Sequence, residues 1–151
     1  MDRLIMGVAT GFGSGYLPKA PGTWGTLLAL PIHLLIIRLP QNQYYVALMV
    51  IFLVAVVSAG SAEKILDHKD PGVVVIDEII GMLIGLIGIA GEPLLLVIGF
   101  VLFRFFDIVK PFPIRWVDKH INGGLGIVLD DVIAGAFTLV ILQVIRKGFL
   151  F

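Results

Sequence analysis

The sequence contains no cysteine, few charged residues and no net charge. Without cysteine, disulfides, thiolate nucleophiles and zinc–thiolate sites are excluded. Eleven basic and eleven acidic residues leave no cationic surplus to bind a nucleic-acid backbone, so nucleic acid is not an expected partner. Charged residues make up 15% of the 151 residues, against about 25% in an ordinary soluble domain. This scarcity argues against a soluble globular protein.

Apolar residues are correspondingly abundant, at 58% of the chain with a mean hydropathy of +1.03. Five stretches reach or approach the length of a transmembrane helix, which is about 20 residues. They cover residues 23–39, 44–62, 73–90, 93–110 and 127–145. We therefore predict an all-α, polytopic membrane helical bundle that forms a single domain over residues 1–151. The first stretch is short and interrupted by Pro31, and a kinked or re-entrant segment is the alternative to a full span there.

The basic residues are distributed unequally between the two sides of the predicted bundle. Alternating helices place the segment up to Gly22 and the 63–72 and 111–126 loops on one side, which we call side A. The short links at 40–43 and 91–92 and the C-terminal tail lie on side B. Side A carries eight Lys or Arg residues, and side B carries only Arg38, Arg146 and Lys147. By the positive-inside rule, side A is cytoplasmic.

Three of the apolar stretches contain ionisable residues. A charge at the bilayer centre costs at least about 2.5–3.5 kcal/mol, so such residues are expected to face the bundle interior or water. Each group lies near the side-A end of its helix, with Asp77 and Asp130 about 5–7 Å inside the helix starts. All three groups are therefore expected at one depth. They are Asp77 and Glu78, then Arg104, Asp107 and Lys110, then Asp130 and Asp131.

Helical spacing also predicts which faces these residues share. Asp77 begins a stripe of small residues that continues through Gly81, Gly85 and Gly88, a pattern on which membrane helices pack closely. Asp131 begins a similar face in the last stretch, followed by Ala134, Gly135 and Thr138. We expect the five carboxylates and the two cations of these stretches to enclose one polar pocket.

The excess of carboxylates has three interpretations. Arg104 and Asp107 are spaced for a structural ion pair, but five acids against two cations leave negative charge that pairing cannot neutralise. An oxygen-ligated divalent cation such as Mg²⁺, Mn²⁺ or Ca²⁺ would balance it, whereas zinc would favour Cys or His. A proton or ion path through a transporter is the third interpretation.

A glycine-rich segment, GFGSGYLPKAPGTWGT, precedes the first stretch at residues 11–26. Its glycines allow backbone amides to approach a ligand, and Pro21 can open a helix. A helix N-terminus there, with the Thr23 or Thr26 hydroxyl and the Lys19 charge, is suited to a phosphate. The alternative is a flexible turn at the membrane surface.

The 111–126 loop combines Phe112 and Trp116 with Arg115 and Lys119. Aromatic anchors beside cations are typical of the membrane interface. Asp118, His120 and the 67–70 turn are interpreted as solvated loop residues. His33 is interpreted as a hydrogen-bonded helix residue.

Four motifs together resemble the phosphatidylglycerophosphatase A family. They are GFGSGYLPKAPGTWG, VVVIDEIIGM, GFVLFRFFDIVKPFPIRWVD and GGLGIVLDDVIAG, in order between residues 11 and 135. The resemblance implies a multi-pass enzyme of the bacterial inner membrane whose active site faces the cytoplasm. It further implies Mg²⁺-dependent hydrolysis of the lipid phosphatidylglycerophosphate to phosphatidylglycerol.

We assign roles on this basis as hypotheses. One of the acids, or a water molecule at the metal, would attack the phosphorus. The catalytic candidates are Asp77, Glu78, Asp107, Asp130 and Asp131, and Mg²⁺ is expected on Asp77, Glu78, Asp107 and Asp131. The substrate-binding candidates are Arg104, Lys110, Lys19, Thr23 and Arg115.

Two other functions compete with a lipid phosphatase. A small ion-coupled transporter should carry its charges across the bilayer midplane, whereas these charges stop near one face. A purely structural membrane subunit would not need an excess of carboxylates. The sequence therefore favours the enzyme.

Overall fold

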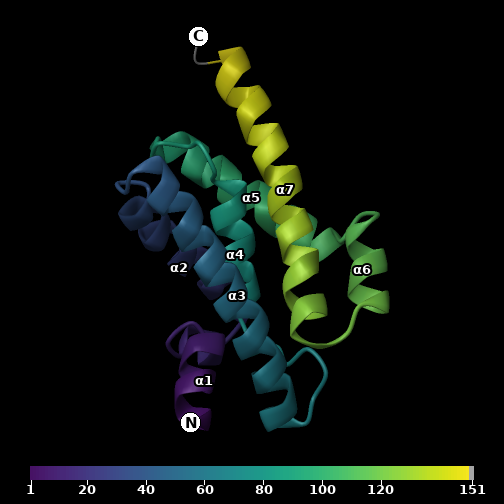
Figure 1. Cartoon of the computed structure of the whole chain (residues 1–151). Helices are drawn as coiled ribbons and strands as arrows, with labels where there is room; N and C mark the ends of the chain where they lie inside the picture. Colours follow the sequence, from purple (N-terminus) through teal and green to yellow (C-terminus); the bar gives the residue numbers. More distant parts are fainter. Residues whose placement is uncertain (150–151) are drawn as a thin grey trace.

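The computed structural model describes residues 1–149, and this part of the chain is helical without any strand (Figure 1). The predicted all-α fold is therefore confirmed. Besides one 3₁₀ turn at Ser14–Tyr16, the helices are α1 (Asp2–Ala9), α2 (Pro21–Ile36), α3 (Gln41–Leu66), α4 (Ile76–Gly85), α5 (Pro93–Val109), α6 (Ile114–His120) and α7 (Gly123–Phe149).

Two of these helices are long and apolar enough to cross a membrane. They are α3 and the Gly123–Gly148 part of α7, each with 26 residues. Large apolar side chains stay exposed along both, including Val57 at 68% and Val144 at 67%, as expected where a surface meets lipid rather than water. Helices α2 and α5 are shorter, with 16 and 17 residues. Two helices of full membrane-spanning length are found among the described residues, so the predicted count of about five spans is not confirmed.

The central helix α4 is much shorter than predicted. Residues 73–90 were expected to form a helix throughout, but α4 ends at Gly85 after 10 residues, which is about 15 Å or half of a bilayer core. The prediction of its extent is wrong because the chain leaves the helix at Leu86, with φ of −92° and ψ of 4°. Gly88 and Gly91 then adopt positive φ values of 81° and 102°, and this left-handed conformation keeps the helix from resuming within the apolar sequence.

The carbonyl groups beyond α4 are satisfied by side chains from α2 and α7. His33 Nε2 lies 2.9 Å from the Ile89 carbonyl oxygen, so its interpretation as a hydrogen-bonded helix residue is confirmed. From α7, Gln143 donates to the Ile87 carbonyl at 2.7 Å and Arg146 donates to the Gly88 carbonyl at 2.5 Å. These contacts replace the hydrogen bonds that a longer helix would have made.

Small residues bring α4 and α7 into close contact. A Cβ atom on Gly135 would lie 2.1 Å from the Gly81 carbonyl oxygen, and one on Gly85 would lie 3.1 Å from Thr138 Cγ2. The predicted small-residue faces therefore meet at Gly81, Gly85, Gly135 and Thr138. The prediction is wrong for Gly88, which lies beyond the end of the helix.

The helices alternate in direction as predicted. In Figure 1, α1 and the α3–α4 and α6–α7 loops lie toward the lower end, and the α2–α3 and α4–α5 turns lie toward the upper end. Within the 111–126 segment, predicted as a loop, the short helix α6 forms. The lower end corresponds to side A and the upper end to side B.

Candidate functional site

A polar pocket of about 280 Å³ lies where α2, α4, α5 and α7 approach side A. The three groups of charged residues reach it because each lies near the side-A end of its own helix. The structure brings all five predicted carboxylates and Arg104 to the wall of this pocket. We call it the carboxylate pocket, and its charged lining comprises Asp70, Asp77, Glu78, Arg104, Asp107, Asp130 and Asp131.

Three of these acids form a tight group. Asp77, Glu78 and Asp131 each offer a carboxylate oxygen, and these oxygens lie within 4.8 Å of one another. Asp77 Oδ1 and Glu78 Oε2 are buried and have no hydrogen-bond partner among the described residues. Unpartnered oxygens at this spacing, without Cys or His, fit a hard divalent cation such as Mg²⁺.

The local fold explains how these three acids meet. Asp77 and Glu78 lie in the first turn of α4, where free backbone N–H groups favour negative charge. Asp131 lies on α7, whose backbone is brought near by the close contact at Gly81. The predicted stripe of small residues therefore allows α7 to approach α4 closely enough for Asp131 to lie beside Asp77 and Glu78.

Arg104 connects two of the acids. Its Nη1 lies 2.5 Å from Asp107 Oδ2 and 3.9 Å from Glu78 Oε1. Asp107, predicted as a metal ligand, therefore lines the pocket as the ion-pair partner of Arg104 and lies outside the group of three. The Arg104 Nε is buried without a hydrogen-bond partner among residues 1–149, which leaves a donor for an oxygen of a substrate.

Lys110 joins α5, α6 and α7. It ends α5 in the left-handed conformation, with φ of 46°, and its Nζ donates to Asp130 Oδ2 at 2.7 Å and to Asp118 Oδ1 at 3.0 Å. Interpreting Asp118 as a solvated loop residue was wrong. The available signal was the Pro111–Pro113 turn, which reverses the chain so that α6 returns toward Lys110.

Asp70 is a second residue that sequence reasoning missed. It was interpreted as part of a solvated turn, yet it lines the carboxylate pocket. Loss of hydration raises the pKa of the Asp70 carboxyl above its ordinary value, although the nearby Lys110 ammonium lowers it. No periodicity indicates this position, because an irregular loop places it there.

The glycine-rich segment places the N-terminus of α2 at the pocket. Ala20, Pro21 and Gly22 line the wall, and a Cβ atom on Gly22 would lie 2.1 Å from Glu78 Oε1. The expected helix start beside a ligand site is therefore present. Free N–H groups at such a start attract anions.

Four of the five predicted substrate-binding residues lie outside the wall of this pocket. Of the two cations expected to enclose it, only Arg104 does so, whereas Lys110 contacts Asp130 from outside the wall. Lys19 is exposed before α2, and its carbonyl accepts a hydrogen bond from Trp24 Nε1 at 3.2 Å. Thr23 is half-buried in the first turn of α2. Arg115 is exposed on α6 and lines a different pocket.

Fold and site together define a class of protein. The bundle contains two apolar helices of membrane length, and its pocket gathers carboxylates, an arginine and a helix N-terminus at one end. This is the arrangement expected of a membrane-associated enzyme with an acidic, metal-suited pocket.

Comparison with known proteins gives the family. The family model of phosphatidylglycerophosphatase A matches residues 7–146, and the chain belongs to this family of phosphatases. Phosphatidylglycerophosphatase A of Escherichia coli (strain K12) is 40% identical over 139 residues, covering 91% of this chain and 81% of the relative. The enzyme of the same name from Haemophilus influenzae is 34% identical over 141 residues, covering 92% and 86%.

A third relative carries a different name. The "Putative phosphatidylinositol-3-phosphatase" of Bacteroides thetaiotaomicron is 38% identical over 146 residues, covering 92% of this chain and 91% of the relative. No solved structure matches the chain.

Proposed function

We propose that this protein hydrolyses the terminal phosphate monoester of phosphatidylglycerophosphate to give phosphatidylglycerol in phospholipid biosynthesis. The observation that carries the proposal is the buried group of Asp77, Glu78 and Asp131 in a chain of the phosphatidylglycerophosphatase A family. Hydrolysis of phosphate monoesters is among the slowest uncatalysed reactions. It therefore needs the concentrated charge that this pocket provides.

Asp77, Glu78 and Asp131 would hold Mg²⁺. When bound, the metal would supply positive charge to phosphoryl oxygens and lower the pKa of a reacting water. The fit rests on the buried oxygens of Asp77 and Glu78 that have no hydrogen-bond partner in the described chain. Neighbouring carboxylates that share no cation would repel one another at considerable cost.

The remaining pocket residues have roles that follow from their partners. Arg104 would donate to phosphoryl oxygens, because its Nε is free and its Nη1 is already oriented by Asp107. Asp130 would accept a proton, and Lys110 holds its carboxylate in position. At the N-terminus of α2 the Gly22 N–H would donate to the phosphate, since Pro21 has no N–H and the Thr23 N–H donates to the Ala20 carbonyl oxygen at 2.9 Å.

The remaining predicted contacts concern the entry of the substrate. Lys19, Thr23 and Arg115 lie around the side-A end and would meet the headgroup before it reaches the carboxylate pocket. The acyl chains would stay in the membrane beside α3, α5 and α7. This end would face the cytoplasm at the inner membrane of a bacterium, and the excess of basic residues on side A supports the cytoplasmic orientation.

A second substrate is favoured by one comparison. The Bacteroides relative is named for phosphatidylinositol 3-phosphate, another lipid with a phosphate monoester in its headgroup. A small ion-coupled transporter has less support, because the carboxylates gather at one end of the bundle instead of lining a path through it.

Phosphate release from defined lipids tests the proposal. Purified protein in detergent micelles receives phosphatidylglycerophosphate or phosphatidylinositol 3-phosphate, each with Mg²⁺ or with EDTA. We expect Mg²⁺-dependent release from phosphatidylglycerophosphate and much slower release from the inositol lipid. Absence of Mg²⁺-dependent release from phosphatidylglycerophosphate would refute the proposal, and faster release from the inositol lipid would reassign the substrate.

A further inference from the structure

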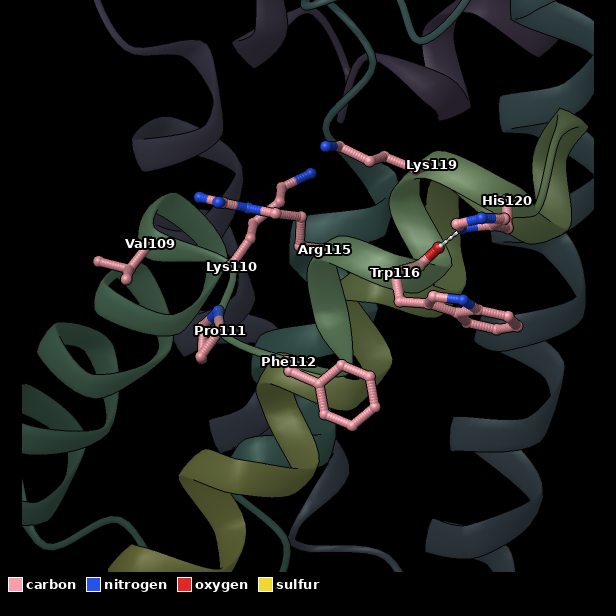
Figure 2. Close-up of a pocket in the computed structure, with 8 residues that line it drawn as sticks. All are labelled: Val109, Lys110, Pro111, Phe112, Arg115, Trp116, Lys119 and His120. Carbon is pink, nitrogen blue, oxygen red and sulfur yellow. Dashed lines mark hydrogen bonds between the residues drawn. The ribbon is translucent and has the colours of Figure 1, made fainter.

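A second pocket, larger than the carboxylate pocket, lies at the turn between α5 and α6. Its volume is about 520 Å³, within the roughly 300–1,000 Å³ typical of small-molecule sites. Figure 2 shows its lining residues, which extend from Val109 at the end of α5 to His120 at the end of α6. We call it the α5–α6 pocket.

The charges of this pocket are all positive. Lys110, Arg115 and Lys119 line it, and its lining includes no carboxylate. Lys110 is already paired with Asp118 and Asp130. Arg115 and Lys119, in contrast, make no ion pair within residues 1–149. Two uncompensated cations on one short helix are available to an anion.

The aromatic residues Phe112 and Trp116 of the pocket are exposed. Phe112 is 82% exposed and Trp116 is 51% exposed. The Trp116 ring stacks on His120 with ring centroids 4.7 Å apart, and His120 Nδ1 lies 2.7 Å from the Trp116 carbonyl oxygen. An exposed tryptophan and phenylalanine beside cations are characteristic of the lipid headgroup level.

Cations and rings occupy different sides of the pocket. In Figure 2 the nitrogen-bearing ends of Lys110, Arg115 and Lys119 gather on one side, and the rings of Phe112 and Trp116 lie on the other. A phospholipid has the same division, with an anionic headgroup followed by apolar chains. A phosphocholine or phosphoethanolamine headgroup fits less well, because its ammonium group would lie beside the three cations of the lining and be repelled by them.

We propose that the α5–α6 pocket binds the phosphodiester headgroup of an anionic glycerophospholipid of the surrounding bilayer. Arg115 and Lys119 contact the phosphate oxygens, and Phe112 and Trp116 contact the first carbons of the acyl chains. The lining of this pocket shares no residue with that of the carboxylate pocket, although Arg115 is also proposed above to meet the entering substrate, so the site is tested by lipid binding without any measurement of hydrolysis. Its specificity is for anionic over zwitterionic lipid.

Trp116 itself serves as the probe. The chain has two tryptophans, Trp24 and Trp116, and Trp24→Phe leaves only the one in the pocket. The full chain is reconstituted in phosphatidylcholine bilayers that contain a fixed fraction of lipid with brominated acyl chains, either phosphatidylglycerol or phosphatidylcholine. Bromine quenches tryptophan fluorescence on contact, so the difference in quenching reports which lipid lies beside Trp116.

We expect brominated phosphatidylglycerol to be enriched beside Trp116 by about fivefold for each free cation at low salt. Arg115→Gln combined with Lys119→Gln should abolish the enrichment, and Arg115→Lys should retain most of it. The matched control is Arg38→Gln combined with Lys147→Gln, which removes two cations from side B and should leave the enrichment unchanged.

Two results would overturn the proposal. One is equal quenching by the two brominated lipids in the Trp24→Phe protein, which needs no further variant. The other is an enrichment that survives the double substitution on α6 while helical circular dichroism is unchanged. Both readouts measure binding alone, so they are independent of whether any lipid is hydrolysed.

Discussion

Gly22 and Glu78 lie so close together that no side chain fits between them. A Cβ atom at position 22 would lie 2.1 Å from Glu78 Oε1. The first turn of α2 therefore rests against the first turn of α4, and the position of a glycine decides where a carboxylate of the pocket lies.

The first prediction concerns this contact. Gly22→Ala should displace Glu78 and lower phosphate release by about 100-fold, the size of effect expected when a reacting group moves by about 1 Å. The assay is Mg²⁺-dependent release from phosphatidylglycerophosphate. Gly7→Ala on α1 is the control, because no atom lies within 4 Å of its Cβ position. Full activity of Gly22→Ala would show that Glu78 is not needed where the structure places it.

The second prediction concerns the acids assigned to the metal. Asp77→Asn, Glu78→Gln and Asp131→Asn should each lower activity by more than about 100-fold, since loss of residues that merely orient ligands already costs 10–100-fold. Asp67→Asn is a control of the same chemistry at an exposed position with φ of 47°, which asparagine tolerates. Full activity in all three folded variants would exclude the assigned set.

The third prediction uses stability in place of activity. Mg²⁺ at about 100 times its dissociation constant should stabilise the folded protein by about 2.7 kcal/mol, seen as a rise in Tm in detergent that EDTA reverses. Asp77→Asn combined with Asp131→Asn should remove the response to Mg²⁺. The pocket would not be the metal site if the double variant kept the same rise.

The fourth prediction concerns Asp118 as a positioning residue for Lys110. Asp118→Asn and Lys110→Met should each lower kcat/KM, and the double variant should be little worse than Lys110→Met alone. Residues that contact one another typically show coupling of about 0.5–3 kcal/mol in such a cycle. Additive losses would mean that Asp118 acts independently of Lys110.

The fifth prediction concerns the contact between α4 and α7. Gly135→Ala would place a Cβ 2.1 Å from the Gly81 carbonyl oxygen and should cost about 1–3 kcal/mol of stability through overpacking. Thermal unfolding in detergent measures the loss. Gly148→Ala is the matched control on the same helix, because nothing lies within 4 Å of its Cβ position. Equal Tm values for the two variants would contradict the close approach.

The depth of the site could be predicted from the sequence, whereas several of its contacts could not. Alternating helix directions place Asp77, Asp107 and Asp130 at one level, and the structure brings them to one pocket. Asp70 and Asp118 were missed because an irregular loop and a chain reversal position them, and neither leaves a periodic pattern. The end of α4 was also missed, since residues 86–90 remain largely apolar after the helix stops.

The shortness of α4 affects how the site responds to bilayers of different thickness. Eight of its ten residues are buried, and side chains from α2 and α7 bond the carbonyls beyond its end. Long helices such as α3 and α7 adjust to a thicker or thinner bilayer by tilting. Helix α4 has little contact with lipid, so it moves together with α2 and α7 when those helices tilt. The acids at its start therefore keep their mutual spacing while the surrounding bilayer varies in thickness.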